Sequence, residues 1–210
     1  MRRRAFVRGA VASTSVLCLS ACDAGKTTPI GAKTESASPE PAADRKPLAW
    51  GRSPAEVLDL VDGKADDYMR VCHHCAQTSF LALRAVFELG NASLVKALTP
   101  LPGIAERGET CGAVTGCLLA LGLVYGRDRL EDWAGWRACL VPARAFCQRF
   151  ESEMGSTMCG DIVEKLFGQR YNLADPADLA KFQRVGPTAK CGGVVRKAVR
   201  IAAGLILDKG

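Results

Sequence analysis

Helix signals recur along the chain after residue 52, and they constrain the fold more than any other feature of the sequence. Ser53 is followed by Pro54 and Glu56, which form a capping box with proline at the first helical position. Apolar residues then repeat with helical spacing, and Gly and Pro separate the segments. No clear run alternates between apolar and polar residues, as a half-buried strand would. We therefore predict a compact, all-α domain of six to eight helices over residues 53–210.

The boundaries of these helices follow from capping and breaking residues. After the helix that starts at Pro54, we expect helices at residues 74–89, 93–98, 111–125, 130–154, 156–167, from 176 onward and 190–207. The Asp62-Gly63 pair predicts the end of the first helix, and Pro142 is expected to kink or split the long 130–154 segment. The aromatic residues of that segment have helical spacing and are expected in the core. They are Trp133, Trp136, Phe146 and Phe150.

The N-terminal residues have the pattern of an export signal. Four arginines precede an uncharged run over residues 10–21, which is too short to span a membrane and is typical of a signal peptide. Residues 19–22 (LSAC) resemble a lipobox, so we expect cleavage of residues 1–21 and lipidation of Cys22. Residues 3–8 (RRAFVR) resemble the twin-arginine export motif, and the general secretory route is the alternative.

Residues 22–52 are expected to form a disordered linker, because they are rich in Pro, Ala, Ser, Thr and charge and lack apolar periodicity. We expect residues up to Gly51 not to pack on the domain. The expected location is the extracytoplasmic side of the cell membrane, with the N-terminal lipid as the membrane contact. After removal of the leader, 24 basic and 22 acidic side chains remain, so the charge does not favour nucleic-acid binding.

Eight cysteines follow Cys22. Four of them fall in the first turn of an expected helix, where free N–H groups and the helix dipole favour a thiolate. These four are Cys75, Cys111, Cys159 and Cys191. We expect them to approach a common centre with lowered pKa values. Gly112 and Gly116 lie on one helix face, where they favour close helix packing.

At these cysteines the sequence resembles the C_GCAxxG_C_C family of redox-active proteins. The residues that carry the resemblance are 74–77 (HCAQ), 108–116 (GETCGAVTG), 155–159 (GSTMC) and Cys191. The resemblance covers most of residues 66–207, and it implies redox activity at the four family cysteines without naming a reaction. The sequence departs from the family pattern at His74, where Asn is usual. It also has four extra cysteines, which are Cys72, Cys117, Cys139 and Cys147.

Several kinds of site are compatible with these thiols. Residues 72–75 (CHHC) suit a redox dithiol of Cys72 and Cys75, with a structural disulfide as the alternative. Zinc is disfavoured because neighbouring ligands in one tetrapeptide rarely surround one ion, and a haem motif is absent because Ala76 follows the second cysteine. The four family cysteines suit an iron–sulfur cluster. Alternatively, the eight thiols form disulfides that stabilise a small exported domain.

Two classes of function remain open at this point. The first is a redox protein that transfers electrons or exchanges disulfides through the family cysteines, with Cys72 as a further candidate. The second is a non-catalytic, disulfide-stabilised helical module that serves a membrane transporter or oxidoreductase. The only histidines are His73 and His74, so a Ser-His-Asp set is not favoured, and no phosphate loop or dinucleotide motif is present.

Overall fold

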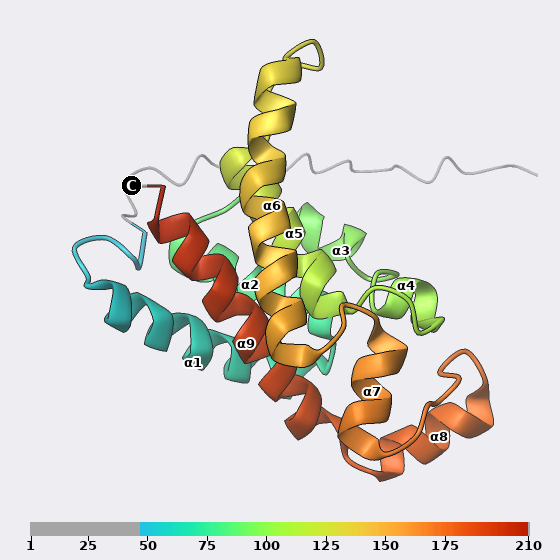
Figure 1. The fold of residues 1–210 in the computed structure, drawn as a ribbon. Coiled ribbons are helices and arrows are strands. Elements are labelled where there is room, and N and C mark those ends of the chain that lie inside the picture. Colours follow the sequence, from blue (N-terminus) through green and yellow to red (C-terminus); the bar gives the residue numbers. More distant parts are fainter. Residues whose placement is uncertain (1–46, 210) are drawn as a thin grey trace, which may run out of the picture. The chain divides into compact units, whose positions relative to one another are not determined.

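The computed structural model describes residues 47–209 of the protein. These residues form nine helices, with a single isolated β-bridge and no strand (Figure 1). The helices are α1 (Pro54–Cys72), α2 (Cys75–Phe87), α3 (Ser93–Ala97), α4 (Gly103–Glu106), α5 (Gly112–Tyr125), α6 (Trp133–Met154), α7 (Cys159–Phe167), α8 (Pro176–Arg184) and α9 (Pro187–Leu207). The all-α prediction is confirmed. The expected signal peptide, Cys22 and the linker up to residue 46 lie outside the described residues.

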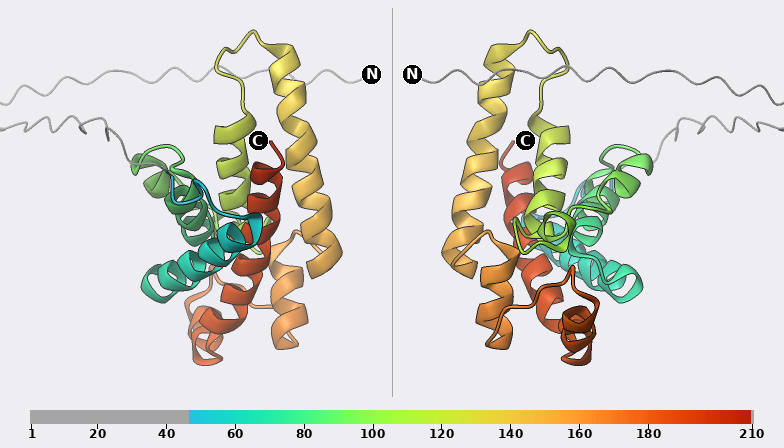
Figure 2. Two further views of the ribbon diagram at one scale, coloured as in Figure 1. Left: turned by 90° about the vertical axis from the view of Figure 1, so that its left-hand side faces the viewer. Right: turned by 90° about the vertical axis from the view of Figure 1, so that its right-hand side faces the viewer.

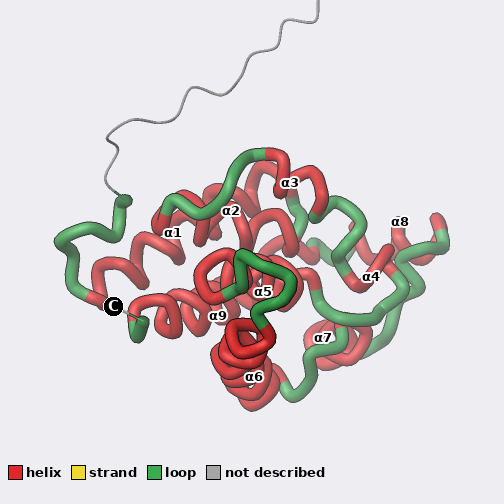
Figure 3. Tube along the Cα trace, turned by 90° about the horizontal axis from the view of Figure 1, so that it is seen from above, coloured by secondary structure: helices red, strands yellow, loops and turns green. Residues whose placement is uncertain are grey.

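The long helices pack in three layers around one core. Seen from above in Figure 3, α5 and α9 lie between the α1–α2 pair on one side and α6 on the other. The contacts agree, because α9 touches α1, α2, α5 and α6, and α2 also packs along α5. A single cluster of buried apolar side chains joins these five helices. None of the helices among residues 47–209 combines the length and apolar character that crossing a bilayer requires.

Helix α1 is longer than the sequence predicts. Ser53 and Glu56 form the expected capping box, but the helix continues through Gly63 to Cys72. The expected stop at Asp62-Gly63 is therefore wrong. Its buried side chains recur every four residues on both sides of the glycine, so the packed face outweighs the small helix propensity of Gly63. These residues are Val57, Val61, Ala65 and Met69.

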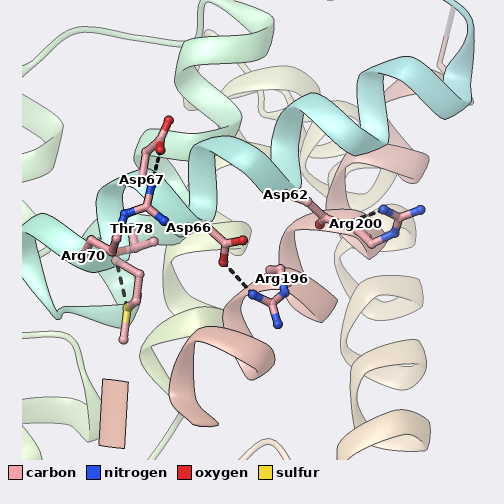
Figure 4. Close-up of polar contacts among 8 residues, drawn as sticks. Asp62, Asp66, Asp67, Arg70, Thr78, Arg196 and Arg200 are labelled. Atoms are coloured by element: carbon pink, nitrogen blue, oxygen red, sulfur yellow. Dashed lines mark hydrogen bonds and ion pairs between the residues drawn. The ribbon is translucent and has the colours of Figure 1, made fainter. Parts of the chain in front are cut away.

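Ion pairs join the outer face of α1 to α9. The Asp66 carboxylate lies 2.6 Å from the Arg196 guanidinium, and Asp62 lies 2.6 Å from Arg200 (Figure 4). The partners of each pair are more than a hundred residues apart in sequence, so these contacts fix the register of the two helices. Exposed pairs of this kind contribute about 0.2–1 kcal/mol each.

The segment that precedes α1 packs on the domain. The Ala49 amide donates a hydrogen bond of 3.1 Å to the Val86 carbonyl oxygen at the end of α2, and Ala49 contacts the core. The expectation that residues up to Gly51 stay free of the domain is therefore wrong for residues 47–51. The cause is the unpaired carbonyl at the C-terminus of α2, which accepts this bond.

The two halves of α6 differ in burial. Phe146 and Phe150 are fully buried, as predicted, whereas Trp133 is 64% exposed and Trp136 is 39% exposed. The prediction of a core position is wrong for the two tryptophans, because the N-terminal half of α6 extends past the ends of α5 and α9 (Figure 2). The helix runs without interruption through Pro142, so the proline does not split it.

Candidate functional site

The contact between α2 and α5 is closer than most helix contacts because α5 carries two glycines there. A Cβ atom on Gly112 would overlap the Cys75 sulfur, and one on Gly116 would overlap the Ala76 carbonyl oxygen. The packing role predicted for these glycines is confirmed. The CGAxxG element thus has a direct physical meaning, because its glycines let the start of α5 rest against the start of α2. Cys111, which directly precedes Gly112, is thereby brought beside Cys75.

A short antiparallel pairing brings the third family cysteine to the same place. Residues 108–111 run beside residues 157–160, around the bridge between Thr110 and Met158. The Cys111 amide donates to the Thr157 carbonyl oxygen at 2.8 Å, and the Cys159 amide donates to the Glu109 carbonyl oxygen at 2.7 Å. The chain segments before α5 and α7 are therefore tied together, and Cys111 and Cys159 become neighbours.

His74 performs the role that an asparagine would have at the start of α2. It is the N-cap residue, and its Nδ1 accepts a 3.4 Å hydrogen bond from the Gln77 amide. Its Nε2 lies 3.0 Å from the Thr99 carbonyl oxygen, which only accepts, so Nε2 carries the proton. This capping explains the departure from the family pattern at position 74. It also leaves the His74 ring hydrogen-bonded on both sides while holding Cys75 at the first helical position.

Cys191 reaches the site from a different kind of position. Helix α9 begins at Pro187 rather than at Lys190, because a proline is favoured at the first helical position. Cys191 is therefore the fifth residue of the helix, and the expectation that it lies in the first turn is wrong. Cys75 and Cys159 each begin their helices, and Cys111 is the N-cap of α5.

A cavity of about 430 Å³ connects three of these cysteines. Cys75, Cys159 and Cys191 line it, and each is half-buried. Cys111 is 5% exposed and lies behind Cys75. The structure thus brings together all four family cysteines, three at the wall of one cavity and one directly behind that wall.

The Cys75 and Cys111 thiols form an asymmetric pair. The Cys111 thiol donates a hydrogen bond to the Cys75 sulfur, and this lowers the pKa of Cys75. The backbone N–H groups of Ala76 and Gly112 lower that pKa further, while burial opposes them. The same thiol contact, together with burial, holds the pKa of Cys111 well above its usual value. Cys75 is therefore the thiol of the pair that ionises first, and Cys111 is the one that keeps its proton.

The other two family cysteines favour the protonated state. Burial raises the pKa of Cys159 to about 12, with further contributions from the charges of Cys75 and Glu106. Burial also raises the pKa of Cys191 to about 12. The expectation of a lowered pKa therefore holds for Cys75 alone. At Cys111 the contact with Cys75 is the main cause of the raised pKa, and burial adds to it, whereas at Cys159 and Cys191 burial is the main cause.

The four extra cysteines lie away from the cavity wall. The Cys72 sulfur contacts the Thr78 hydroxyl at 3.1 Å, and that hydroxyl also contacts the Met69 sulfur. The Cys72 thiol is free, so the structure shows no Cys72–Cys75 disulfide. Cys117 is fully buried in the core, and Cys139 and Cys147 lie half-buried on α6.

Sequence reasoning missed a left-handed turn at the edge of the cavity. Gly103, Ile104, Ala105 and Glu106 all have positive φ, between 47° and 62°. For residues with a side chain this conformation costs roughly 1–2 kcal/mol each. The turn places Glu106 at the cavity wall and Gly103 against Cys159. Pro102-Gly103 signals a turn in the sequence, but nothing there predicts that the left-handed conformation continues through Ile104.

The thiols are not arranged as a metal centre. All eight cysteines in the described part of the chain are free. Within residues 47–209, no three His, Cys, Asp or Glu side chains form a group that could hold a metal ion. An iron–sulfur cluster is held by four thiolates, and the cysteines of the described residues do not form such a group. The residues as placed therefore do not fit a cluster.

Comparison with known proteins identifies the family. No curated protein and no solved structure matched the chain. Residues 73–205 match the family described as "Putative redox-active protein (C_GCAxxG_C_C)", which is more than half of the chain and includes all four family cysteines. The chain therefore belongs to the C_GCAxxG_C_C family of redox-active proteins.

Proposed function

We propose that this protein is a dithiol–disulfide redox protein in which Cys75 attacks and Cys111 resolves. The observation that carries the proposal is the asymmetry of the pair. One cysteine lines a cavity and its thiol has a lowered pKa, while its partner is buried and has a raised pKa. Thiol–disulfide exchange needs a thiolate that substrates can reach and a second thiol beside it.

In the proposed reaction, the Cys75 thiolate attacks one sulfur of a substrate disulfide, and the other substrate sulfur leaves as a thiolate. The Cys111 thiol then loses its proton and attacks the Cys75 sulfur, which releases the second substrate sulfur. The protein ends with a Cys75–Cys111 disulfide, and the substrate has gained two electrons. Cys159 and Cys191 stay protonated at neutral pH, so attack is directed to Cys75.

The test uses the full chain, reduced under anaerobic conditions and mixed with bis(2-hydroxyethyl) disulfide. We expect mass spectrometry to find one disulfide, between Cys75 and Cys111. The Cys75→Ser variant should lose the reaction, and Cys111→Ser should accumulate a mixed disulfide at Cys75. Cys139→Ser serves as the control, because this thiol lies on α6 and away from the cavity. A disulfide between other cysteines, or full activity of Cys75→Ser, would contradict the proposal.

The place of action is a separate proposal. We infer that the protein is held at the extracytoplasmic face of the membrane by a lipid on Cys22, and that its redox partner is reached there. Support comes from the LSAC sequence and the apolar run before it. Replacing Cys22 by Ser, or treating cells with globomycin, should release or misprocess the protein. Normal processing and membrane retention in both cases would argue against lipidation.

A further inference from the structure

The cavity beside the thiols has a predominantly apolar wall. Side chains from α1, the α3–α4 connection, α7, α8 and the loop before α8 meet there. They are Met69, Pro102, Val163, Leu173, Leu179 and Phe182. Its volume of about 430 Å³ is in the range of sites that enclose a small molecule. A ring of carbon atoms would replace water at this wall and gain from the hydrophobic effect.

The charged side chains at the wall disfavour anionic ligands. None of the described residues that line the cavity is Lys or Arg, and the one carboxylate among them is Glu106. Nucleotide cofactors carry phosphates, and small biological disulfides such as glutathione disulfide carry carboxylates. Such groups require cationic side chains or free backbone N–H groups. Among the described residues, the side chains of the wall therefore suit an uncharged ligand better than an anion.

The polar groups at the cavity suit a ligand that accepts hydrogen bonds. The His73 Nδ1 atom lies 3.1 Å from the Thr188 hydroxyl, and both residues line the cavity. A hydroxyl and an imidazole can each donate a hydrogen bond to a carbonyl oxygen.

We propose that this cavity binds a small, uncharged quinone, which oxidises the Cys75–Cys111 dithiol. The inference rests on the proposed function and names its electron acceptor, because the quinone takes the place of the substrate disulfide in oxidising the same dithiol. Quinones are uncharged in both redox states and carry carbonyl oxygens, and they accept two electrons, the number that forming one disulfide releases. Cys75 of this dithiol lines the cavity, so a ring bound there lies beside it.

The reaction balances without another reactant. The Cys75 thiolate adds to a ring carbon of the quinone, and the ring oxygen takes a proton from solvent. The Cys111 thiol then gives its proton to the second ring oxygen, and its sulfur attacks the Cys75 sulfur. The carbon–sulfur bond breaks, and its electron pair stays on the ring. The products are one Cys75–Cys111 disulfide and one quinol.

The experiment mixes the reduced full-length protein with duroquinone under anaerobic conditions. Duroquinone has no ring hydrogen, so the product of thiol addition cannot lose one and become a stable aryl thioether. We expect one quinol per Cys75–Cys111 disulfide and a rate that saturates with quinone concentration. Leu179→Asp, which places a charge at the cavity wall, should raise the half-saturating concentration at least tenfold. Leu179→Trp, which keeps the wall apolar but fills the cavity, should do the same.

The control is Leu140→Asp, which changes a half-buried leucine of α6 outside the cavity and should leave the quinone reaction unchanged. Oxidation by bis(2-hydroxyethyl) disulfide should also change less than twofold in Leu140→Asp. A quinone rate that stays linear to the solubility limit, and that both Leu179 variants leave unaltered, would overturn the inference but not the proposed function. If neither oxidant forms the Cys75–Cys111 disulfide, both proposals are wrong.

Discussion

The thiol end of the molecule, where Cys75, Cys111, Cys159 and Cys191 lie, and the N-terminal half of α6 both carry apolar residues and cysteine, yet they pack differently. At the thiol end, Gly112 and Gly116 let two helices approach until a Cβ atom no longer fits between them. On α6, Trp133 and Val141 are 64% and 67% exposed. The difference shows that apolar spacing produces burial only where a neighbouring helix is long enough to cover it.

The largest expected effect contrasts the two ends of α6. Phe150→Ala removes a fully buried ring that packs on Phe146, and we expect it to lower the free energy of unfolding by about 3–5 kcal/mol. Trp133→Ala, at the exposed end, should change this free energy by less than about 0.5 kcal/mol. Urea denaturation followed by circular dichroism measures both. Similar losses for the two variants would mean that the exposed half of α6 is also packed.

The next effect concerns the close contact between α2 and α5. Gly116→Ala places a methyl group against the Ala76 carbonyl oxygen, and we expect a loss of about 1–3 kcal/mol of stability together with slower reaction of Cys75. Gly122→Ala is the matched control on the same helix, because no atom lies within 4 Å of the added Cβ. This control should gain roughly 0.5–1 kcal/mol. A stability gain in both variants would show that the contact is looser than described.

A smaller effect separates the sulfurs within the thiol end. The pKa of Cys75 is lowered, so its thiolate is present at a lower pH than that of an ordinary thiol. The pKa values of Cys159 and Cys191 are about 12, so their thiolates appear only as the pH approaches that value. We expect iodoacetamide at pH 7 to modify Cys75 at least tenfold faster than either, as peptide mass spectrometry would show. Equal rates would remove the evidence for an asymmetric pair.

The smallest effect lies on the surface between α1 and α9. Asp66→Asn breaks the ion pair with Arg196. The side chains of both partners are about 40% exposed. We expect a loss of about 0.2–1 kcal/mol in dilute buffer, which should shrink as salt is added. Thermal unfolding at low and high ionic strength provides the measurement. A loss as large as that of Gly116→Ala would mean that this surface contributes as much as the thiol end.

The sequence predicts much of the fold because helix caps are local. Ser53 and Glu56 identify the start of α1 from four residues alone. The order of the family cysteines in the sequence likewise identifies the residues of the site. The missed features depend on residues far away in the chain. Gly63 stays helical because α1 packs along α9, and the end of α6 is exposed because α5 and α9 stop short of it. The pKa of Cys159 likewise depends on burial, which spacing does not reveal.

The pairing of residues 108–111 with residues 157–160 also has a consequence for how the chain folds. It joins points about 50 residues apart, so closing this loop carries an entropy cost that local helix formation does not. We expect α5 and α6 to form first and the pairing to follow. Until it closes, Cys111 and Cys159 are not held beside each other, and oxidation at that stage would trap mispaired cysteines. The order of folding and oxidation therefore matters as much as the final geometry.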